Sequence, residues 1–236
     1  MNNQLWSEKI LKIFHPTFKH RWEVYEEYLQ KSLSKKMIWI DLGCGYNLDI
    51  NEKRYMVFYG AGVDLVYTKS KTNGPFIIAD ICDLPFKSNS IHIISLRFVI
   101  EHIKDTNRLL REINRVLVTD GTLILLTTNF WSPLILLPKL LPFSIRRYII
   151  KTLFKVQEDD IFPTYHNLNT YLKVKNVPYD LHLTNLEFIQ DLNYTNRVVF
   201  IILMIYHSIT RIGFLKIFRT NLLVVYKKMK HRHQIA

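Results

Sequence analysis

Hydrophobic residues between positions 35 and 130 gather in short runs that are separated by polar segments. Runs of this kind occupy residues 37–41, 61–65, 76–79, 91–96 and 121–127. Continuous apolar runs of four to eight residues, bounded by turn residues, predict buried strands. Residues 186–189 and 222–226 are candidates for two further strands.

Two other segments show helical spacing instead. In residues 20–34 the apolar and aromatic positions recur every three or four residues, at Trp22, Tyr25, Tyr28 and Leu29. Residues 105–117 show the same periodicity, and Asp105 is suited to the N-cap position. We therefore expect one helix before the first strand and another between the fourth and fifth strands.

The first apolar run ends in Asp41-Leu42-Gly43-Cys44-Gly45. Glycines lack a Cβ atom, so a turn with two of them lets a ligand approach the main chain. A dinucleotide-binding turn would have a third glycine at position 48, where this chain has Leu48, and NAD is therefore disfavoured. An acidic residue at the end of the strand suits a nucleoside-type ligand that carries an ammonium group.

Aspartates also close the second and third runs. Asp64 lies 21 residues after Gly43, the usual reach for a carboxylate that accepts hydrogen bonds from a ribose diol, and Asp80 follows the third run. The carboxyl ends of parallel strands line the crevice where open α/β sheets bind ligands. These three carboxylates are therefore predicted to line one ligand site.

Together these motifs resemble the class I S-adenosylmethionine-dependent methyltransferases, specifically the small-molecule type with a glutamate-histidine pair, here Glu101-His102, after strand four. The resemblance covers residues 35–130. It implies an α/β, Rossmann-like fold with a seven-stranded, mostly parallel sheet and helices on both faces. The last strand would be antiparallel, and an insertion would precede strand six.

The resemblance also implies roles for individual residues and S-adenosyl-L-methionine as cofactor. Asp41, Gly43 and Gly45 would surround the methionine part, Asp64 the ribose hydroxyls, and Asp80 with Ile81 the adenine. This chain departs from the family pattern at two places: His92 replaces an aspartate, and Thr119-Asp120-Gly121 replaces a proline-glycine-glycine turn. Neither departure touches an expected cofactor contact.

For the acceptor side, the sequence offers two histidines and a tyrosine. The polar and aromatic segment 160–170 reads as an ordered loop, in which Tyr165 and His166 are candidate substrate contacts. An oxygen acceptor would need a base, for which His102 and His166 are candidate catalytic residues, whereas a nitrogen or carbon acceptor needs none. The alternatives are a packing or capping role for His102 and a loop tied down by its own side chains.

Charge is unevenly distributed along the chain. The net charge is +12, and residues 131–236 hold 15 of the 32 lysines and arginines but only 6 of the 20 acidic residues. A basic half can attract nucleic acid, anionic lipid or a phosphorylated substrate. The two cysteines form no C-x-x-C pair, so we expect neither a metal site nor a disulfide, which fits a reducing cytoplasm.

Two apolar segments accompany this charge. Residues 131–155 contain an apolar stretch that is interrupted by prolines and Lys139 and bordered by Arg146, Arg147, Lys151 and Lys155. This pattern suggests a segment that lies on a membrane interface or one that is buried against the core. In residues 197–219, nine consecutive apolar residues at 198–206 predict a helix that is buried on most sides or touches lipid. Residues 227–233 add a basic cluster that can bind anionic headgroups.

We therefore expect one methyltransferase domain over residues 1–236, with a helical cap at 1–35, a cofactor-binding core at 36–130, an apolar and basic insertion at 131–180, and C-terminal strands and a helix at 181–236. The hypothesis is methyl transfer to a small-molecule, glycan or lipid-linked acceptor in the cytoplasm, with peripheral attachment to the inner face of a membrane. No signal peptide is visible in residues 1–20. The alternatives are an RNA methyltransferase that uses the basic half and, third, a non-catalytic cofactor-binding protein.

Overall fold

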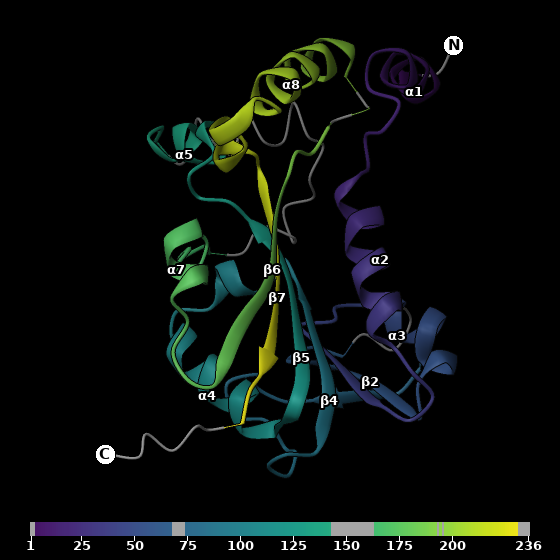
Figure 1. Ribbon diagram of the computed structural model, residues 1–236, viewed down its shortest axis with the longest axis vertical. Coiled ribbons are helices and arrows are strands. Elements are labelled where there is room, and N and C mark those ends of the chain that lie inside the picture. Colours follow the sequence, from purple (N-terminus) through teal and green to yellow (C-terminus); the bar gives the residue numbers. More distant parts are fainter. Residues whose placement is uncertain (1–2, 68–73, 143–162, 193, 195, 231–236) are drawn as a thin grey trace.

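Seven strands form a single twisted sheet in the computed structural model, which describes residues 3–67, 74–142, 163–192, 194 and 196–230 (Figure 1). The strands are β1 (Ile38–Leu42), β2 (Tyr59–Asp64), β3 (Phe76–Ile78), β4 (Ile91–Arg97), β5 (Leu117–Thr128), β6 (Leu181–Ile189) and β7 (Asn221–Lys228). Their order is β3-β2-β1-β4-β5-β7-β6, and β7 runs antiparallel to both neighbours. The expected Rossmann-like sheet with an antiparallel last strand is confirmed.

Helices cover both faces of this sheet. The α-helices are α1 (Asn3–Phe14), α2 (Arg21–Ser32), α3 (Leu48–Lys53), α4 (Thr106–Val116), α5 (Pro133–Lys139), α7 (Tyr171–Lys175) and α8 (Arg197–Thr210). Short 3₁₀ segments are η1 (Arg54–Met56), η2 (Ile100–His102) and η4 (Gly213–Phe218). In Figure 1, α4 and α7 lie on one side of the sheet and α2 and α3 on the other.

Successive strand residues point to opposite faces, so the central strands supply two separate cores. In β5, Leu123 and Leu125 belong to the core beneath α4 and α7, whereas Ile124 and Leu126 belong to the core beneath α2 and α3. This is why the sequence shows continuous apolar runs rather than alternation. The parallel strands β1, β2, β3 and β4 end at the same edge of the sheet, and the loops at this edge carry the candidate site.

The predicted helix and strand bounds are close to the observed ones where the apolar signal is strong. The helix expected at 105–117 is α4, and Asp105 accepts a hydrogen bond of 3.0 Å from the backbone N–H of Arg108, as an N-cap does. The signal was weaker for β6, which begins at Leu181 rather than 186. This strand pairs only with β7, and its first half contains His182 and Thr184, as an edge strand allows.

Of the two alternatives for the apolar helix, burial on most sides is wrong for α8. Of its 14 residues only Phe200, His207 and Thr210 are buried, because α8 lies beyond the end of the sheet, where α1 covers one side of it (Figure 1). In the described part of the segment 131–155, Trp131 is half-buried, with its ring 6.3 Å from that of Tyr171, whereas Leu137 and Leu140 are 58% and 73% exposed. Arg146, Arg147, Lys151 and Lys155 lie outside the described residues. No helix among the described residues has the length and apolar character needed to cross a membrane.

Candidate cofactor and acceptor site

The turn after β1 depends on two glycines in the left-handed backbone region, for two different reasons. Gly43 has φ +66°, and a Cβ atom there would lie 2.3 Å from Cγ2 of Val99, so a side chain at position 43 cannot fit without movement. Gly45 has φ +54°, but a Cβ atom there would meet no other atom within 4 Å. Open space beside bare main chain at Gly45 is what close approach of a ligand requires.

The same turn is tied to the end of β2 by Asp64. Its Oδ2 accepts a hydrogen bond of 2.8 Å from the backbone N–H of Gly45, and its Oδ1 accepts one of 2.7 Å from the N–H of Leu65. A carboxylate has about four acceptor positions. Asp64 is only partly buried, so two fixed oxygens keep capacity for the hydroxyl groups of a diol.

Asp41 lies near the end of β1, directly before the glycine turn, and is buried. Its Oδ1 accepts a 2.6 Å hydrogen bond from the hydroxyl of Ser95, which itself accepts one of 2.8 Å from Trp39 Nε1. Burial raises the pKa of Asp41 to about 7, although the nearby Arg97 opposes this shift. A ligand with a positive charge would therefore favour the ionised form of Asp41.

Arg97 at the end of β4 and Asp49 in α3 belong to this site, and the sequence reasoning missed both. Arg97 Nη2 lies 2.6 Å from Asp49 Oδ2, and its guanidinium lies over the rings of Trp22 and Tyr25 from α2. Arg97 directly follows the apolar run 91–96, and this position at the end of a predicted strand could have identified it as a site residue. Helix α2 is thereby in contact with Arg97 at the end of β4.

Asp80 and Ile81 follow β3 at the same edge of the sheet. Asp80 is exposed, and its Oδ1 accepts a 2.8 Å hydrogen bond from the N–H of Cys82, which shapes the turn. Ile81 is 7% exposed and packs in the core beneath α4. The side chain of Ile81 is thus mostly buried in the core. A ligand could contact only its backbone and its small exposed surface.

The segment after β4 connects this turn to the acceptor side. Val99 covers Gly43, and two residues later the buried Glu101 accepts a 2.7 Å hydrogen bond from Thr127 Oγ1. Burial raises the pKa of Glu101. The carbonyl oxygen of Glu101 accepts from the N–H groups of Tyr165 at 2.7 Å and His166 at 3.3 Å. The expected acceptor loop is therefore held on η2.

His102 in η2 lies next to this loop, which contains Tyr165 and His166, but the three side chains have different environments. His102 Nδ1 lies 2.8 Å from the carbonyl oxygen of Pro163, so this nitrogen carries the proton and donates. Tyr165 is 46% exposed. His166 is buried, with its ring 5.2 Å from that of Phe130 and its Nδ1 3.4 Å from Thr128 Oγ1. His166 thus has the surroundings of a packed residue that shapes the loop.

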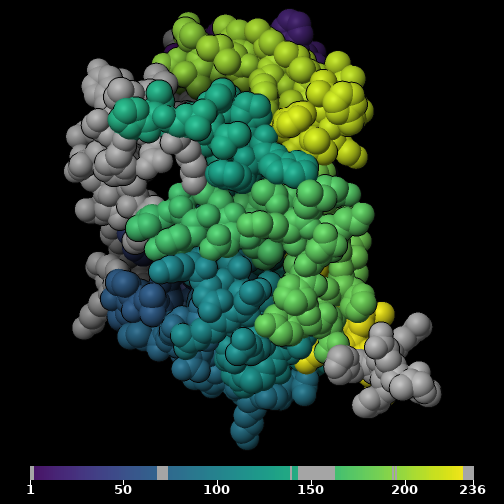
Figure 2. All heavy atoms as spheres, turned by 90° about the vertical axis from the view of Figure 1, so that its left-hand side faces the viewer, coloured from purple at the N-terminus to yellow at the C-terminus, as the bar shows by residue number. Residues whose placement is uncertain are grey.

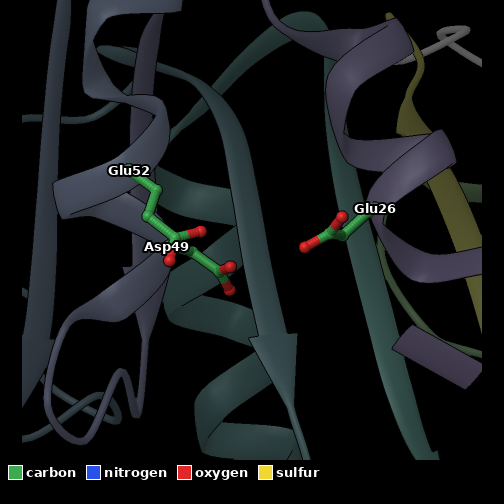
Figure 3. A group of neighbouring side chains, drawn as sticks. All are labelled: Glu26, Asp49 and Glu52. Carbon is green, nitrogen blue, oxygen red and sulfur yellow. The ribbon is translucent and has the colours of Figure 1, made fainter. Parts of the chain in front are cut away.

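A group of carboxylates near the turn has the spacing of a cation site (Figure 3). Glu26 comes from α2, and Asp49 and Glu52 come from α3. The ammonium group of Lys53, however, lies 3.2 Å from oxygens of Asp49 and Glu52 and 3.3 Å from one of Glu26. Lys53 supplies the positive charge within this cluster, so we interpret it as an ionic contact between α2 and α3.

Comparisons with known proteins agree with this geometry. Residues 40–125 match the family model described as a methyltransferase domain. An uncharacterized protein of Methanocaldococcus jannaschii is 30% identical over 133 residues, which are 53% of this chain and 51% of that protein. The chain therefore aligns with about half the length of this curated relative.

Two solved structures share the fold across nearly the whole chain. One is a chain of the complex that contains the Haloferax volcanii Trm112 methyltransferase activator, with 15% identity, TM-score 0.54, and coverage of 97% of this chain and 98% of that chain. The other is the geranyl diphosphate C-methyltransferase of Streptomyces coelicolor, with 14% identity, TM-score 0.54, and coverage of 95% and 83%. These two structures show that the chain has their fold, and within that fold residues 40–125 match the methyltransferase domain.

Proposed function

We propose that this protein transfers the methyl group of S-adenosyl-L-methionine to a small-molecule or lipid-linked acceptor. The observation that carries the proposal is the hydrogen bond from Gly45 to Asp64, which places an open glycine turn beside a fixed carboxylate at the ends of β1 and β2. When bound, S-adenosylmethionine supplies a methyl group that is already activated by its sulfonium charge. The protein then has to position donor and acceptor and exclude water.

Each residue of the turn has a distinct task in this proposal. Asp41 binds the ammonium group of the methionine part and becomes ionised when it does so. Gly43 lets the turn pack against Val99, and Gly45 lets the methionine part lie against the main chain. Asp64 accepts from the ribose diol, and Asp80 with Ile81 borders the adenine.

The acceptor lies against the loop that Glu101 holds. Tyr165, which is exposed, contacts the acceptor. His102 takes the proton when the acceptor atom is oxygen, because its Nδ1 is engaged by Pro163 and Nε2 is then the basic nitrogen of the neutral ring. His166 keeps the loop in place beside Phe130 and serves as the second candidate base.

The acceptor class is argued from the surface next to the site. Apolar side chains of α5 and α8 are exposed at the carboxyl edge of the sheet, which suits an amphiphilic acceptor taken from a cytoplasmic membrane surface. The Streptomyces coelicolor neighbour is named for geranyl diphosphate, an acceptor of the same amphiphilic kind. A glycan acceptor remains within the proposal, since Tyr165 and the loop amides can bind hydroxyl groups.

An RNA methyltransferase is the second candidate, because the C-terminal half carries most of the excess positive charge. Its basic residues alternate with exposed aliphatic ones rather than with a stacking platform of aromatic residues, which favours lipid over RNA. A non-catalytic cofactor-binding protein is the third candidate.

The decisive experiment is turnover of S-adenosylmethionine labelled in the methyl group, with lipid, glycan and RNA fractions offered separately. Label should enter the lipid or small-molecule fraction, and Asp64→Ala should reduce the incorporation. Incorporation into RNA alone would favour the second candidate. Binding of the donor without transfer to any fraction would favour the third.

A further inference from the structure

We propose that the outer side of α8 and the segment after it form a docking face for an anionic lipid surface. This docking face consists of exposed apolar side chains, namely Val198, Ile201, Ile202, Ile205, Ile209, Ile212 and Phe214. The membrane contact itself does not depend on the proposed function. Its consequence does, namely that docking brings the methyl-transfer site to a lipid-linked acceptor.

The docking face is a single stripe along the helix. Positions 198, 202, 205 and 209 follow one another at intervals of four, three and four residues, so these side chains project on one side. They are 50% to 66% exposed. Phe214, in η4, is 74% exposed and extends the stripe beyond the helix.

Helix α8 has a second apolar side, which packs against α1. Phe200 is fully buried, and its ring meets that of Trp6 edge-on at 5.9 Å. Leu203 and Met204 pack against the same cluster, which also contains Leu11 of α1. A helix that is apolar on both sides, with one side covered and the other open, is suited to a second apolar phase.

Charge around the docking face identifies that phase as an anionic lipid surface. The chain has no acidic residue between Leu192 and its end, whereas Arg197 and Arg211 flank α8 on the side of α1, near Trp6 and His15, and the exposed Lys216 follows in η4. Basic residues at the rim of an inserted apolar stripe are attracted by anionic headgroups. A second copy of this chain, which carries the same positive net charge, would not attract these basic residues.

The docking face lies at the same end of the molecule as the acceptor loop. Figure 1 places α8 and α5 above the carboxyl ends of the parallel strands, and Figure 2 shows these segments and η4 together at one end of the surface. Asn129 Nδ2 donates hydrogen bonds of 2.7 Å to the carbonyl oxygens of Ile217, within η4, and Arg219, directly after it. The next residue, Phe130, lies against His166. A bound surface therefore adjoins the acceptor side of the site.

Vesicle flotation tests this proposal with the full chain. Wild-type protein should float with phosphatidylcholine vesicles that contain phosphatidylglycerol, more weakly at high salt, and far less with phosphatidylcholine alone. The double variant Ile202→Glu/Ile205→Glu should bind these vesicles at least about tenfold more weakly than wild type. Phe58→Glu is the matched control, because Phe58 is 77% exposed and precedes β2 at the opposite edge of the sheet, and it should float like wild type.

Three outcomes would overturn the docking face: no flotation of wild type with anionic vesicles at low salt, equal flotation of the double variant, or a wild-type dimer that the double variant dissociates in light scattering. The last would make the face an interface between two copies of the chain. Binding of S-adenosylmethionine without vesicles, measured by calorimetry on the same proteins, reports on the proposed function separately. It should be unchanged in the double variant.

Discussion

The backbone N–H of Gly45 donates a 2.8 Å hydrogen bond to Oδ2 of Asp64 and so joins the turn after β1 to the end of β2. This contact crosses 19 residues of sequence. It sets the carboxylate beside the one position of the turn where a Cβ atom would meet open space. The main chain and the carboxylate can therefore contact the same ligand.

Replacement of this carboxylate should weaken cofactor binding. Asp64→Ala removes a charged acceptor for the ribose diol, and we expect a loss of about 1.5–3 kcal/mol in the binding free energy of S-adenosylmethionine. Isothermal titration calorimetry measures it, with Glu8→Ala on α1 as a control of equal charge change far from the turn. Unchanged affinity of Asp64→Ala, or tight binding of NAD to wild type, would contradict the assignment.

The two glycines should respond differently to alanine. Gly43→Ala places a methyl group against Val99 and strains a left-handed residue, for a loss of about 3 kcal/mol in the free energy of unfolding. Gly45→Ala meets only the backbone strain, about 1–2 kcal/mol. Urea denaturation gives both values. In a Val99→Ala background the cost of Gly43→Ala should fall to that of Gly45→Ala, and equal costs of Gly43→Ala in both backgrounds would refute this contact.

Stability should depend on pH through Asp41. Burial raises its pKa in the folded protein to about 7 from an ordinary value of 3.8, so the folded state holds a proton that the unfolded chain releases. The stabilisation from this proton is complete below pH 4 and is lost as the pH rises toward 7, by up to about 1.4 kcal/mol per pH unit. Urea unfolding of wild type and Asp41→Asn from pH 4 to 8 should show this decline in wild type only. Parallel profiles would show that Asp41 is ionised throughout.

His166 should contribute to loop stability rather than to the cofactor turn. His166→Ala removes the contact with Phe130 and leaves alanine at φ +51°, for a loss of about 1–3 kcal/mol in the free energy of unfolding. His166→Asn should lose less, because asparagine adopts this backbone region more readily. Affinity for S-adenosylmethionine should stay unchanged in both variants. Equal destabilisation by the two substitutions would argue against the backbone contribution.

The amino-acid sequence by itself determined the local features of this protein. Runs of apolar residues predicted the central strands, and Asp41, Gly43, Gly45 and Asp64 predicted a ligand site at their ends, since all of these follow from spacing along a short stretch of chain. Edge strand β6 was recognised only in part, because a strand with one neighbour tolerates polar residues and loses the apolar signal.

Contacts between distant segments were decided by the tertiary structure alone. The pairing of Arg97 with Asp49 and the support of Tyr165 and His166 by the carbonyl of Glu101 join residues that are far apart in sequence and carry no shared pattern. The apolar run of α8 predicts a helix, but its composition is the same whether its outer side is covered or open. Whether the outer side of α8 is buried depends on which helices and strands pack against it, and α8 lies beyond the end of the sheet.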